Sequence, residues 1–240
     1  QATNRLASEP SATPLVAPHP FTPFRHGYEN LFEVSPEKLV PQPIAQSEAT
    51  PEQKPATKII PHSAMRRSIA QRMLESTLHS AHVTAVFEAD LSAVIHHKQR
   101  HQEEYEQQGI KLTYTAYFVM AAVKALQAVP EVNSRWHEEG LEFFSDCNIG
   151  IATAVENGVI VPVIQKAQDL NLGGVASRLQ ELTNKARTGK LKLQELQNGT
   201  FTITNHGVSG SLIATPIIYP PQSAILGIGK MEKRVVVVTR

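Results

Sequence analysis

Apolar residues recur at helical spacing in three segments of the sequence. Residues 64–79 follow Ser63, a preferred N-cap residue, and predict an amphipathic helix. Its apolar face holds Met65, Ile69, Met73, Leu74 and Leu78. Residues 114–128 are apolar nearly all round, so we expect this second helix in the middle of a domain. Residues 172–186 repeat the spacing, and Gly189 stands just past them, as helix ends prefer.

Shorter apolar runs predict strands between and after these helices. Alternation over residues 83–89 predicts one strand, and Asp90 is then expected to cap a further helix. Two more runs flank Asn157-Gly158, a pair typical of a tight hairpin turn. These two runs cover residues 148–155 and 159–165, and the remaining predicted strands cover residues 201–204, 223–228 and 235–238. Because helices and strands mix without a strict repeat, we expect an α/β or α+β fold with a mixed sheet.

The composition changes near residue 57. Ten of the 16 prolines but only one of the 13 glycines lie in residues 1–57. Pro, Ala, Ser, Thr and Gln dominate there, and such a stretch has little to bury. We therefore expect residues 1–57 to be a largely irregular linker or arm, and residues 58–240 to be the folded domain.

Composition and charge narrow the function classes. Of the 240 residues, 41% are hydrophobic and 19% are charged, which is typical of a globular protein. The formal net charge of +1 gives no reason to expect a nucleic-acid partner. Residues 196–229 carry no Asp, Glu, Lys or Arg, but prolines and polar residues interrupt them, so we expect no membrane span. The single cysteine, Cys147, excludes an internal disulfide and predicts a buried thiol in a reducing compartment.

Ten histidines invite metal-binding or catalytic interpretations. His97 and His101 stand four residues apart, the spacing of two metal ligands on one helical face, and His96 adjoins them. No Glu lies between them as in the zinc-protease pattern, and their neighbours are polar, so we expect no metal site. His206 lies in a glycine-rich turn, where we expect it to act as a turn residue.

The most informative segment covers residues 199–229. A predicted strand leads Thr204 and Asn205 into a flexible turn, and the surrounding residues are uncharged. A hydroxyl in such a dry site can donate to a developing oxyanion. The same residues also fit an ordinary β-turn with a capping threonine, and local sequence does not separate the two interpretations.

Three parts of the sequence together resemble a known family. They are residues 65–73 (MRRSIAQRM), residues 148–152 (NIGIA) with 158–162 (GVIVP), and residues 199–229, which include TITNHGVSG and TPIIYPPQS. Each is similar to the dihydrolipoamide acyltransferase core of 2-oxo acid dehydrogenase complexes, and the similarity covers residues 58–238 in order. It implies a fold similar to chloramphenicol acetyltransferase, in which helices flank a mixed sheet and chains form trimers.

The resemblance also implies roles for particular residues. Thr204 matches the hydroxyl that stabilises the oxyanion. Asn205, Lys98, Thr113 and Gly229 match contacts to coenzyme A, and the Lys98 ammonium suits a phosphate. The implied reaction moves an acyl group, succinyl or acetyl, between coenzyme A and a dihydrolipoyl group that another domain carries. A base helps this reaction, because a free thiol has a pKa of about 8.5.

Partners follow from the same resemblance. Family members assemble as homotrimers into hollow cores of 24 or 60 subunits, with the active site between two subunits. They work with a dehydrogenase component and with dihydrolipoamide dehydrogenase. We expect no nucleic-acid or membrane partner. The expected compartment is a bacterial cytoplasm, with the mitochondrial matrix as the alternative.

The sequence departs from the family because it lacks the motif that carries the catalytic base. The family's histidine base lies in an Asp-His-Arg-x-x-Asp-Gly motif that these 240 residues lack, so we assign the base to none of the ten histidines. We expect the sequence to be a piece of an active acyltransferase lacking its C-terminal segment, and this piece alone to be inactive. Two alternatives stay open. One is a catalytically inactive scaffold subunit of such a complex, and the other is a stand-alone acetyltransferase of the antibiotic-modifying type.

Overall fold

The computed structural model describes residues 57–237 except residue 157. The expected linker of residues 1–57 therefore lies outside the described residues, apart from its last position. The helices are α1 (Ala64–His79), α2 (Ser92–Gln107), α3 (Tyr114–Ala128) and α4 (Leu172–Arg187). The strands are β1 (Ser134–His137), β2 (Gly140–Phe143), β3 (Ile149–Val155), β4 (Gly158–Ile160), β5 (Val163–Ile164), β6 (Phe201–Asn205) and β7 (Ile225–Ile228). Single 3₁₀ turns form η2 (Pro130–Val132), η3 (Ala167–Asp169), η4 (Leu193–Leu196) and η5 (Gly207–Ser209).

A mixed sheet lies at the centre of the domain. Its strand order is β4-β3-β6-β7, and β5 also pairs with β3. Strands β3, β6 and β7 run parallel to one another, whereas β4 and β5 run antiparallel to β3. The β3–β4 pair is the hairpin that the sequence predicts at Asn157-Gly158. The mixed sheet expected from the sequence is thus confirmed.

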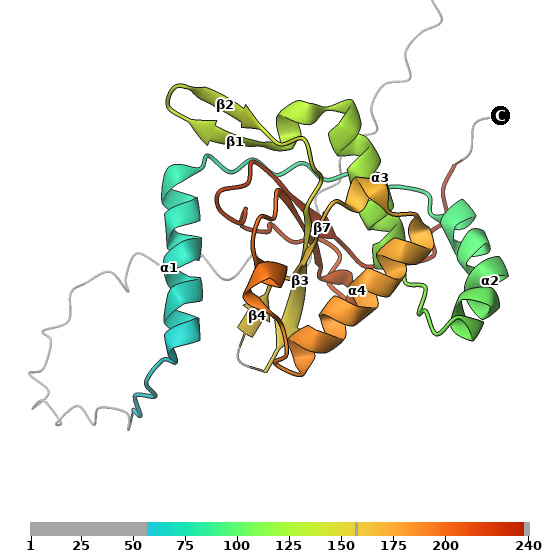
Figure 1. Ribbon diagram of the computed structural model, residues 1–240, viewed down its shortest axis with the longest axis horizontal. Helices are drawn as coiled ribbons and strands as arrows, with labels where there is room; N and C mark the ends of the chain where they lie inside the picture. The colour runs from blue at the N-terminus through green and yellow to red at the C-terminus, as the bar shows by residue number, and fades with distance from the viewer. Residues whose placement is uncertain (1–56, 157, 238–240) are drawn as a thin grey trace, which may run out of the picture. The chain divides into compact units, whose positions relative to one another are not determined.

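Helices α3 and α4 pack on one face of this sheet (Figure 1). The apolar cluster between them and the sheet includes Ala116, Val119, Val123, Leu126, Ile149, Val175, Leu179, Leu182, Phe201 and Ile203. Burying one large apolar side chain contributes roughly 1.5–3 kcal/mol, so this cluster is the main source of stability. The central position expected for the helix over residues 114–128 is confirmed.

Helix α1 begins and ends where the sequence predicts. The Ser63 hydroxyl accepts a hydrogen bond from the Arg66 N–H at 3.2 Å, so Ser63 is the N-cap. The apolar face of α1 is only partly covered, however: Ile69 lies against Gly158 of β4, whereas Leu74 is 54% exposed and Leu78 is 71% exposed. The pattern therefore predicts the helix correctly, and the described chain leaves much of its apolar face open.

Two predicted strands are wrong. Residues 81–90 are extended but pair with no strand, and Val83 and Phe87 are about nine-tenths exposed. Alternation alone formed no strand there, because no neighbouring strand supplies the backbone hydrogen bonds. Residues 235–237 likewise form no strand, and residue 238 lies outside the described part. The Asp90 carboxylate does accept from the Ser92 N–H at 2.8 Å, although the helix N-cap is Leu91.

The sequence patterns missed the hairpin of β1 and β2. It pairs Trp136 with Leu141 and Arg135 with Glu142, outside the main sheet. Cys147, just after this hairpin, is 3% exposed, and burial raises the pKa of its thiol. The buried thiol expected from the sequence is confirmed. Among residues 57–156 and 158–237, no helix is long and apolar enough to cross a membrane.

Candidate active site

Thr204 and Asn205 end strand β6 at the carboxyl edge of the three parallel strands. Thr204 lies opposite Ala152 of β3 and Gly227 of β7, and Asn205 lies opposite Ile228. Both residues are partly exposed. In open sheets of parallel strands, ligands bind at this edge. The two predicted residues therefore occupy a position that suits a binding site.

The side chains of these two residues face opposite sides of β6. Because successive side chains of a strand alternate, Asn205 shares a face with the buried Ile203, which packs toward α3. The Asn205 Nδ2 donates to the Oγ1 of Thr115, in the first turn of α3, at 3.3 Å. Thr204 shares the other face with Thr202. The predicted hydroxyl and the predicted amide thus lie on two sides of the same strand.

The first turn of α3 gathers three of the predicted residues. Besides Asn205, it holds Thr113, which is the N-cap but makes no capping bond through its hydroxyl. Lys98 of α2 places its ammonium 5.5 Å from the ring centroid of Tyr114, while donating to the Gln102 side chain at 2.7 Å. A helix N-terminus carries a partial positive charge, and together with Lys98 it favours an anion such as a phosphate.

Gly229 lies just past β7, where the backbone leaves no room for a side chain. A Cβ at Gly229 would lie 2.2 Å from the Leu212 carbonyl oxygen, and one at Gly207 would lie 2.2 Å from the Gly229 oxygen. The His206 ring lies beside this crossing, with its Nε2 3.3 Å from the place of a Cβ at Gly227. His206 also begins the η5 turn, in keeping with the expected role as a turn residue.

Unpaired polar atoms concentrate at this site. Within the described part of the chain, five buried side-chain polar atoms have no hydrogen-bond partner. Three of them are Oγ1 of Thr113, Oδ1 of Asn205 and Nδ1 of His206. Leaving such an atom unpaired costs about 1–3 kcal/mol, and native structures hold few of them. Among the described residues, these three atoms therefore offer hydrogen-bonding capacity near the end of β6 and the first turn of α3.

The loop of residues 211–224 walls the Thr204 face of the sheet. Thr202 donates from its buried hydroxyl to the Oε1 of the buried Gln222 at 2.6 Å. Pro216 lies against Gly227, the β7 residue that is opposite Thr204. The wall is therefore fixed to the strand that carries the predicted hydroxyl.

Helix α1 and strand β1 hold the same loop from outside. The buried Ser76 donates from its hydroxyl to the Ile218 carbonyl oxygen at 2.6 Å. The Arg72 Nη1 donates to the Tyr219 hydroxyl at 2.7 Å. The Ser223 hydroxyl donates to a backbone carbonyl of β1 at 2.7 Å. Helix α1 and strand β1, together with Thr202 of β6, thus restrict the position of the loop.

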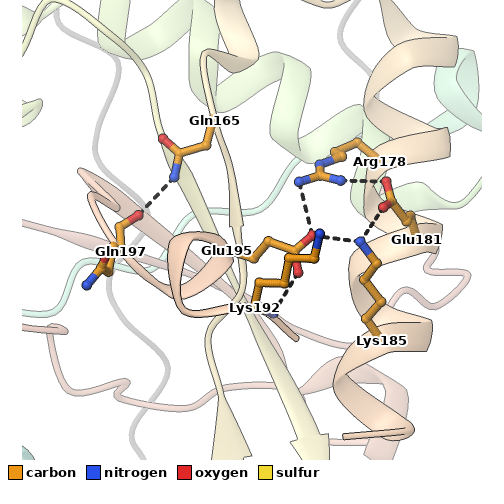
Figure 2. A network of polar contacts seen from close by, with 7 residues as sticks. All are labelled: Gln165, Arg178, Glu181, Lys185, Lys192, Glu195 and Gln197. Carbon is orange, nitrogen blue, oxygen red and sulfur yellow. Dashed lines mark hydrogen bonds and ion pairs between the residues drawn. The ribbon is translucent and has the colours of Figure 1, made fainter. Parts of the chain in front are cut away.

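A charged cluster anchors the segment that leads into β6 (Figure 2). Glu195 of η4 is 7% exposed and accepts from the Lys185 Nζ at 2.8 Å and from the Lys192 N–H at 2.9 Å. These two bonds, the Lys185 contact first, hold the pKa of the Glu195 carboxyl below its ordinary value. The Glu181 carboxylate forms ion pairs with Arg178 and Lys185, at 2.5 Å each, and these pairs hold both cationic side chains in place on α4.

Two surface hollows lie away from this site. One, of about 410 Å³, is lined by Leu126, Gln127, Pro130, Asn133, Phe143, Phe144, Ser145 and Cys147. The other, of about 340 Å³, is lined by Glu104, Tyr105, Gln108, Ile110, Asn171, Gly173, Gly174 and Ser177. Neither hollow includes any of the five predicted site residues.

Sequence reasoning missed two residues that shape the site. Thr115 is the partner of Asn205, and its only signal is its place two residues after Thr113 at the start of an apolar helix. Gln222 fixes the wall through Thr202, and no local pattern encodes a contact that depends on the path of the loop.

A family model described as 2-oxoacid dehydrogenases acyltransferase (catalytic domain) matches residues 54–240. The chain belongs to this family. The resemblance expected from the sequence motifs is therefore confirmed. Members of this acyltransferase family are enzymes by their description.

Relatives of this acyltransferase-family chain include succinyltransferases. The dihydrolipoyllysine-residue succinyltransferase component of the 2-oxoglutarate dehydrogenase complex from Rickettsia typhi is 39% identical over 183 residues, or 76% of this chain and 46% of the relative. The component of the same description from Bacillus subtilis is 37% identical over 211 residues, or 86% of this chain and 51% of the relative. The chain spans about half the length of the curated relatives it matches.

Solved structures with a similar fold are acyltransferase cores. A probable dihydrolipoamide acetyltransferase from Listeria monocytogenes has a TM-score of 0.74 and 33% identity, over 76% of this chain and 78% of that one. The dihydrolipoamide acetyltransferase of Azotobacter vinelandii has a TM-score of 0.74 and 29% identity, over 76% of each chain. Its structure was studied for the roles of a serine, a histidine and an asparagine in the catalytic mechanism. The cubic core of a pyruvate dehydrogenase multienzyme complex has a TM-score of 0.75 and 28% identity, over 82% of this chain and 81% of that one. The expected chloramphenicol acetyltransferase-like fold is confirmed.

Proposed function

We propose that this chain is the acyl-transferring domain of a 2-oxo acid dehydrogenase complex component. In the reaction, a thiolate attacks the carbonyl carbon of an acyl thioester, and a new C–S bond forms as the carbonyl oxygen becomes an oxyanion. The old C–S bond then breaks, and the departing thiolate takes up the proton that the attacking thiol lost. One observation carries the proposal. The predicted site residues, which are spread between positions 98 and 229 of the sequence, lie at the carboxyl edge of β6 and β7 and around the first turn of α3.

Thr204 donates to the oxyanion in this proposal. Its place at the end of β6, partly exposed and beside a fixed wall, suits a preorganised donor. The catalytic study of a serine in the Azotobacter vinelandii relative is consistent with a hydroxyl in this role. We assign the base to no residue of this chain.

Coenzyme A contacts Asn205, Lys98, Thr113 and Gly229 in this proposal. The Lys98 ammonium and the N-terminus of α3 suit a phosphate. The unpaired atoms of Thr113 and Asn205 supply hydrogen-bonding capacity. Gly229 allows two backbone segments to approach each other closely.

The acyl group is succinyl in the first form of the proposal, because the relatives named above are succinyltransferase components. Acetyl is the alternative, since the similar solved structures are acetyltransferases. The acyl group is exchanged with a dihydrolipoyl group on another domain. We place the reaction in a bacterial cytoplasm, as the bacterial origin of the relatives suggests, with the mitochondrial matrix as the alternative.

Assembly into homotrimers, and then into a core of 24 or 60 chains, is part of the proposal. The largely open apolar face of α1 and the exposed Val83 and Phe87 support it, because large exposed apolar patches mark interaction sites. One similar solved structure is itself the core of a multienzyme complex. The dehydrogenase and dihydrolipoamide dehydrogenase components would bind to such a core. A scaffold subunit without catalysis is the second candidate, and the same exposed surfaces favour it.

Calorimetry with coenzyme A, an acyl-transfer assay and a mass measurement test these proposals. We expect coenzyme A to bind, and Asn205→Ala to weaken binding at least fivefold while Asn184→Ala, on the exposed face of α4, leaves it unchanged. A trimer or larger particle that binds no coenzyme A and transfers no acyl group to dihydrolipoamide would support the scaffold instead. Transfer to chloramphenicol but not to dihydrolipoamide would favour a stand-alone acetyltransferase.

A further inference from the structure

The backbone of Ile218, in the loop of residues 211–224 that walls the Thr204 face, is held by side chains at both of its polar groups. The Ile218 N–H donates to the Nε2 of His82 at 3.1 Å. The Ile218 carbonyl oxygen accepts from the hydroxyl of the buried Ser76 at 2.6 Å. One residue of the loop is therefore fixed by two side chains that lie 136 and 142 positions away in the sequence.

The two contacts of the His82 ring agree on one tautomer. A backbone N–H only donates, so the Nε2 of His82 accepts from Ile218 through its lone pair. The neutral ring then carries its hydrogen on Nδ1, which lies 2.9 Å from the Ser80 carbonyl oxygen, an acceptor. Because the bond at one nitrogen sets the state of the other, this contact prepares the ring to accept. Ser80 is the C-cap of α1, so the ring is tied to the end of that helix.

The fixed residue follows closely after Pro216, which packs on the strand beside Thr204. A Cβ at Gly227 would lie 3.0 Å from the Pro216 Cγ, and Gly227 is the β7 residue opposite Thr204. Asn205 contacts the first turn of α3 on the other face of β6. A displacement of the loop would therefore change the surroundings of Thr204 and leave the proposed coenzyme A contact of Asn205 in place.

We propose that His82 is a positioning residue for the acyl transfer. Its Nε2, together with the Ser76 hydroxyl, holds the loop against β7 beside Thr204. A donor to a developing oxyanion is effective when its surroundings are already in place and need not reorganise during the reaction. His82 supports that order through the backbone of Ile218. This inference rests on the proposed function, and it adds a residue that lies 122 positions before Thr204.

Acyl-transfer kinetics in a longer chain that carries the base motif test this role. We expect His82→Ala to lower kcat by about fivefold, the effect of one lost neutral hydrogen bond, and to leave the Kd for coenzyme A within about twofold. His82→Gln should recover most of the activity, because its amide oxygen can accept from the Ile218 N–H. His79→Ala is the matched control, since the His79 ring bonds within α1, to the Glu75 carbonyl oxygen. An unchanged kcat in His82→Ala, or no recovery in His82→Gln, would overturn the proposal.

Two NMR measurements on the same chain need no activity. The Ile218 amide should exchange its hydrogen about fivefold faster in His82→Ala than in wild type, and at the wild-type rate in His79→Ala. In the wild-type chain, the neutral His82 ring should carry its hydrogen on Nδ1. A hydrogen on Nε2 would contradict the contact, even if every variant failed to fold. The expected exchange rates without any acyl transfer in wild type would overturn the proposed function, whereas the fixing of the loop by His82 would stand.

Discussion

The side-chain amide of Asn205 donates to the hydroxyl of Thr115 across 90 positions of sequence, at 3.3 Å. This bond joins the end of β6 to the first turn of α3, and it leaves the Oδ1 of Asn205 unpaired. It therefore connects the two parts of the proposed coenzyme A contact.

Replacing Thr115 by valine tests this connection. Valine keeps the shape but removes the acceptor, so the Asn205 amide loses its orientation. We expect the Kd for coenzyme A to rise by about tenfold, since one neutral hydrogen bond contributes roughly 0.5–1.5 kcal/mol. Calorimetry measures the change, and Thr183→Val on α4 is the control. Equal affinities for the two variants would contradict a role of Asn205 in binding.

Replacing Thr204 by alanine tests the oxyanion role, in a longer chain that carries the base motif. We expect kcat to fall by roughly 100-fold while the Kd for coenzyme A stays within about twofold, because the bond forms only in the transition state. Thr204→Ser keeps a hydroxyl and should recover most of the activity. Weak binding with nearly normal kcat in Thr204→Ala would instead make Thr204 a binding residue.

Acid should destabilise the domain partly through Glu195. Its pKa is lowered from 4.5, first by the hydrogen bond from Lys185 and then by the Lys192 N–H. A carboxyl with a lower pKa in the folded state stabilises the fold fully above its unfolded pKa, and this contribution is lost as pH falls through the folded value. Glu195→Gln should therefore be less stable than wild type at pH 7, and its stability should fall less between pH 5 and pH 3. Urea unfolding across this range measures both effects, with Glu104→Gln on the surface of α2 as the control.

Gly229→Ala should destabilise the fold by about 3 kcal/mol. The new Cβ would meet the Leu212 carbonyl oxygen at 2.2 Å, and a backbone atom cannot move aside as a flexible side chain can. Gly174→Ala is the matched control, because its Cβ would make ordinary contacts of 3.4 Å or more within α4. That variant should gain up to about 1 kcal/mol. An unchanged free energy of unfolding in Gly229→Ala would mean that the two backbone segments at Gly229 and Leu212 can move apart at little cost.

Helices were predictable because each signals itself locally. The spacing after Ser63 and the apolar run before Pro130 gave bounds that match α1 and α3. Strands depend on partners that lie far away in the sequence. The alternation at residues 83–89 was therefore misleading, and the hairpin of β1 and β2 was missed.

The candidate site was partly predictable from motifs, and its geometry was not. Motif resemblance selected Thr204 and Asn205, but the parallel register that aligns Thr204 with Gly227 follows from packing over the whole sheet. The same holds for Thr115 and Gln222, whose partners lie 90 and 20 positions away. His97 of α2 likewise contacts the Tyr117 hydroxyl of α3, 20 positions away, and spacing within α2 does not encode this contact.

The loop that walls Thr204 is attached to α1 through Ser76 and Arg72, and much of the apolar face of α1 is open. A surface that covers this face also holds the loop. Thermodynamic linkage makes such coupling reciprocal. If association at α1 raises the affinity for a ligand that needs the wall in place, that ligand raises the affinity of association by the same factor. Substrate affinity and the concentration at which the chains associate should therefore change together.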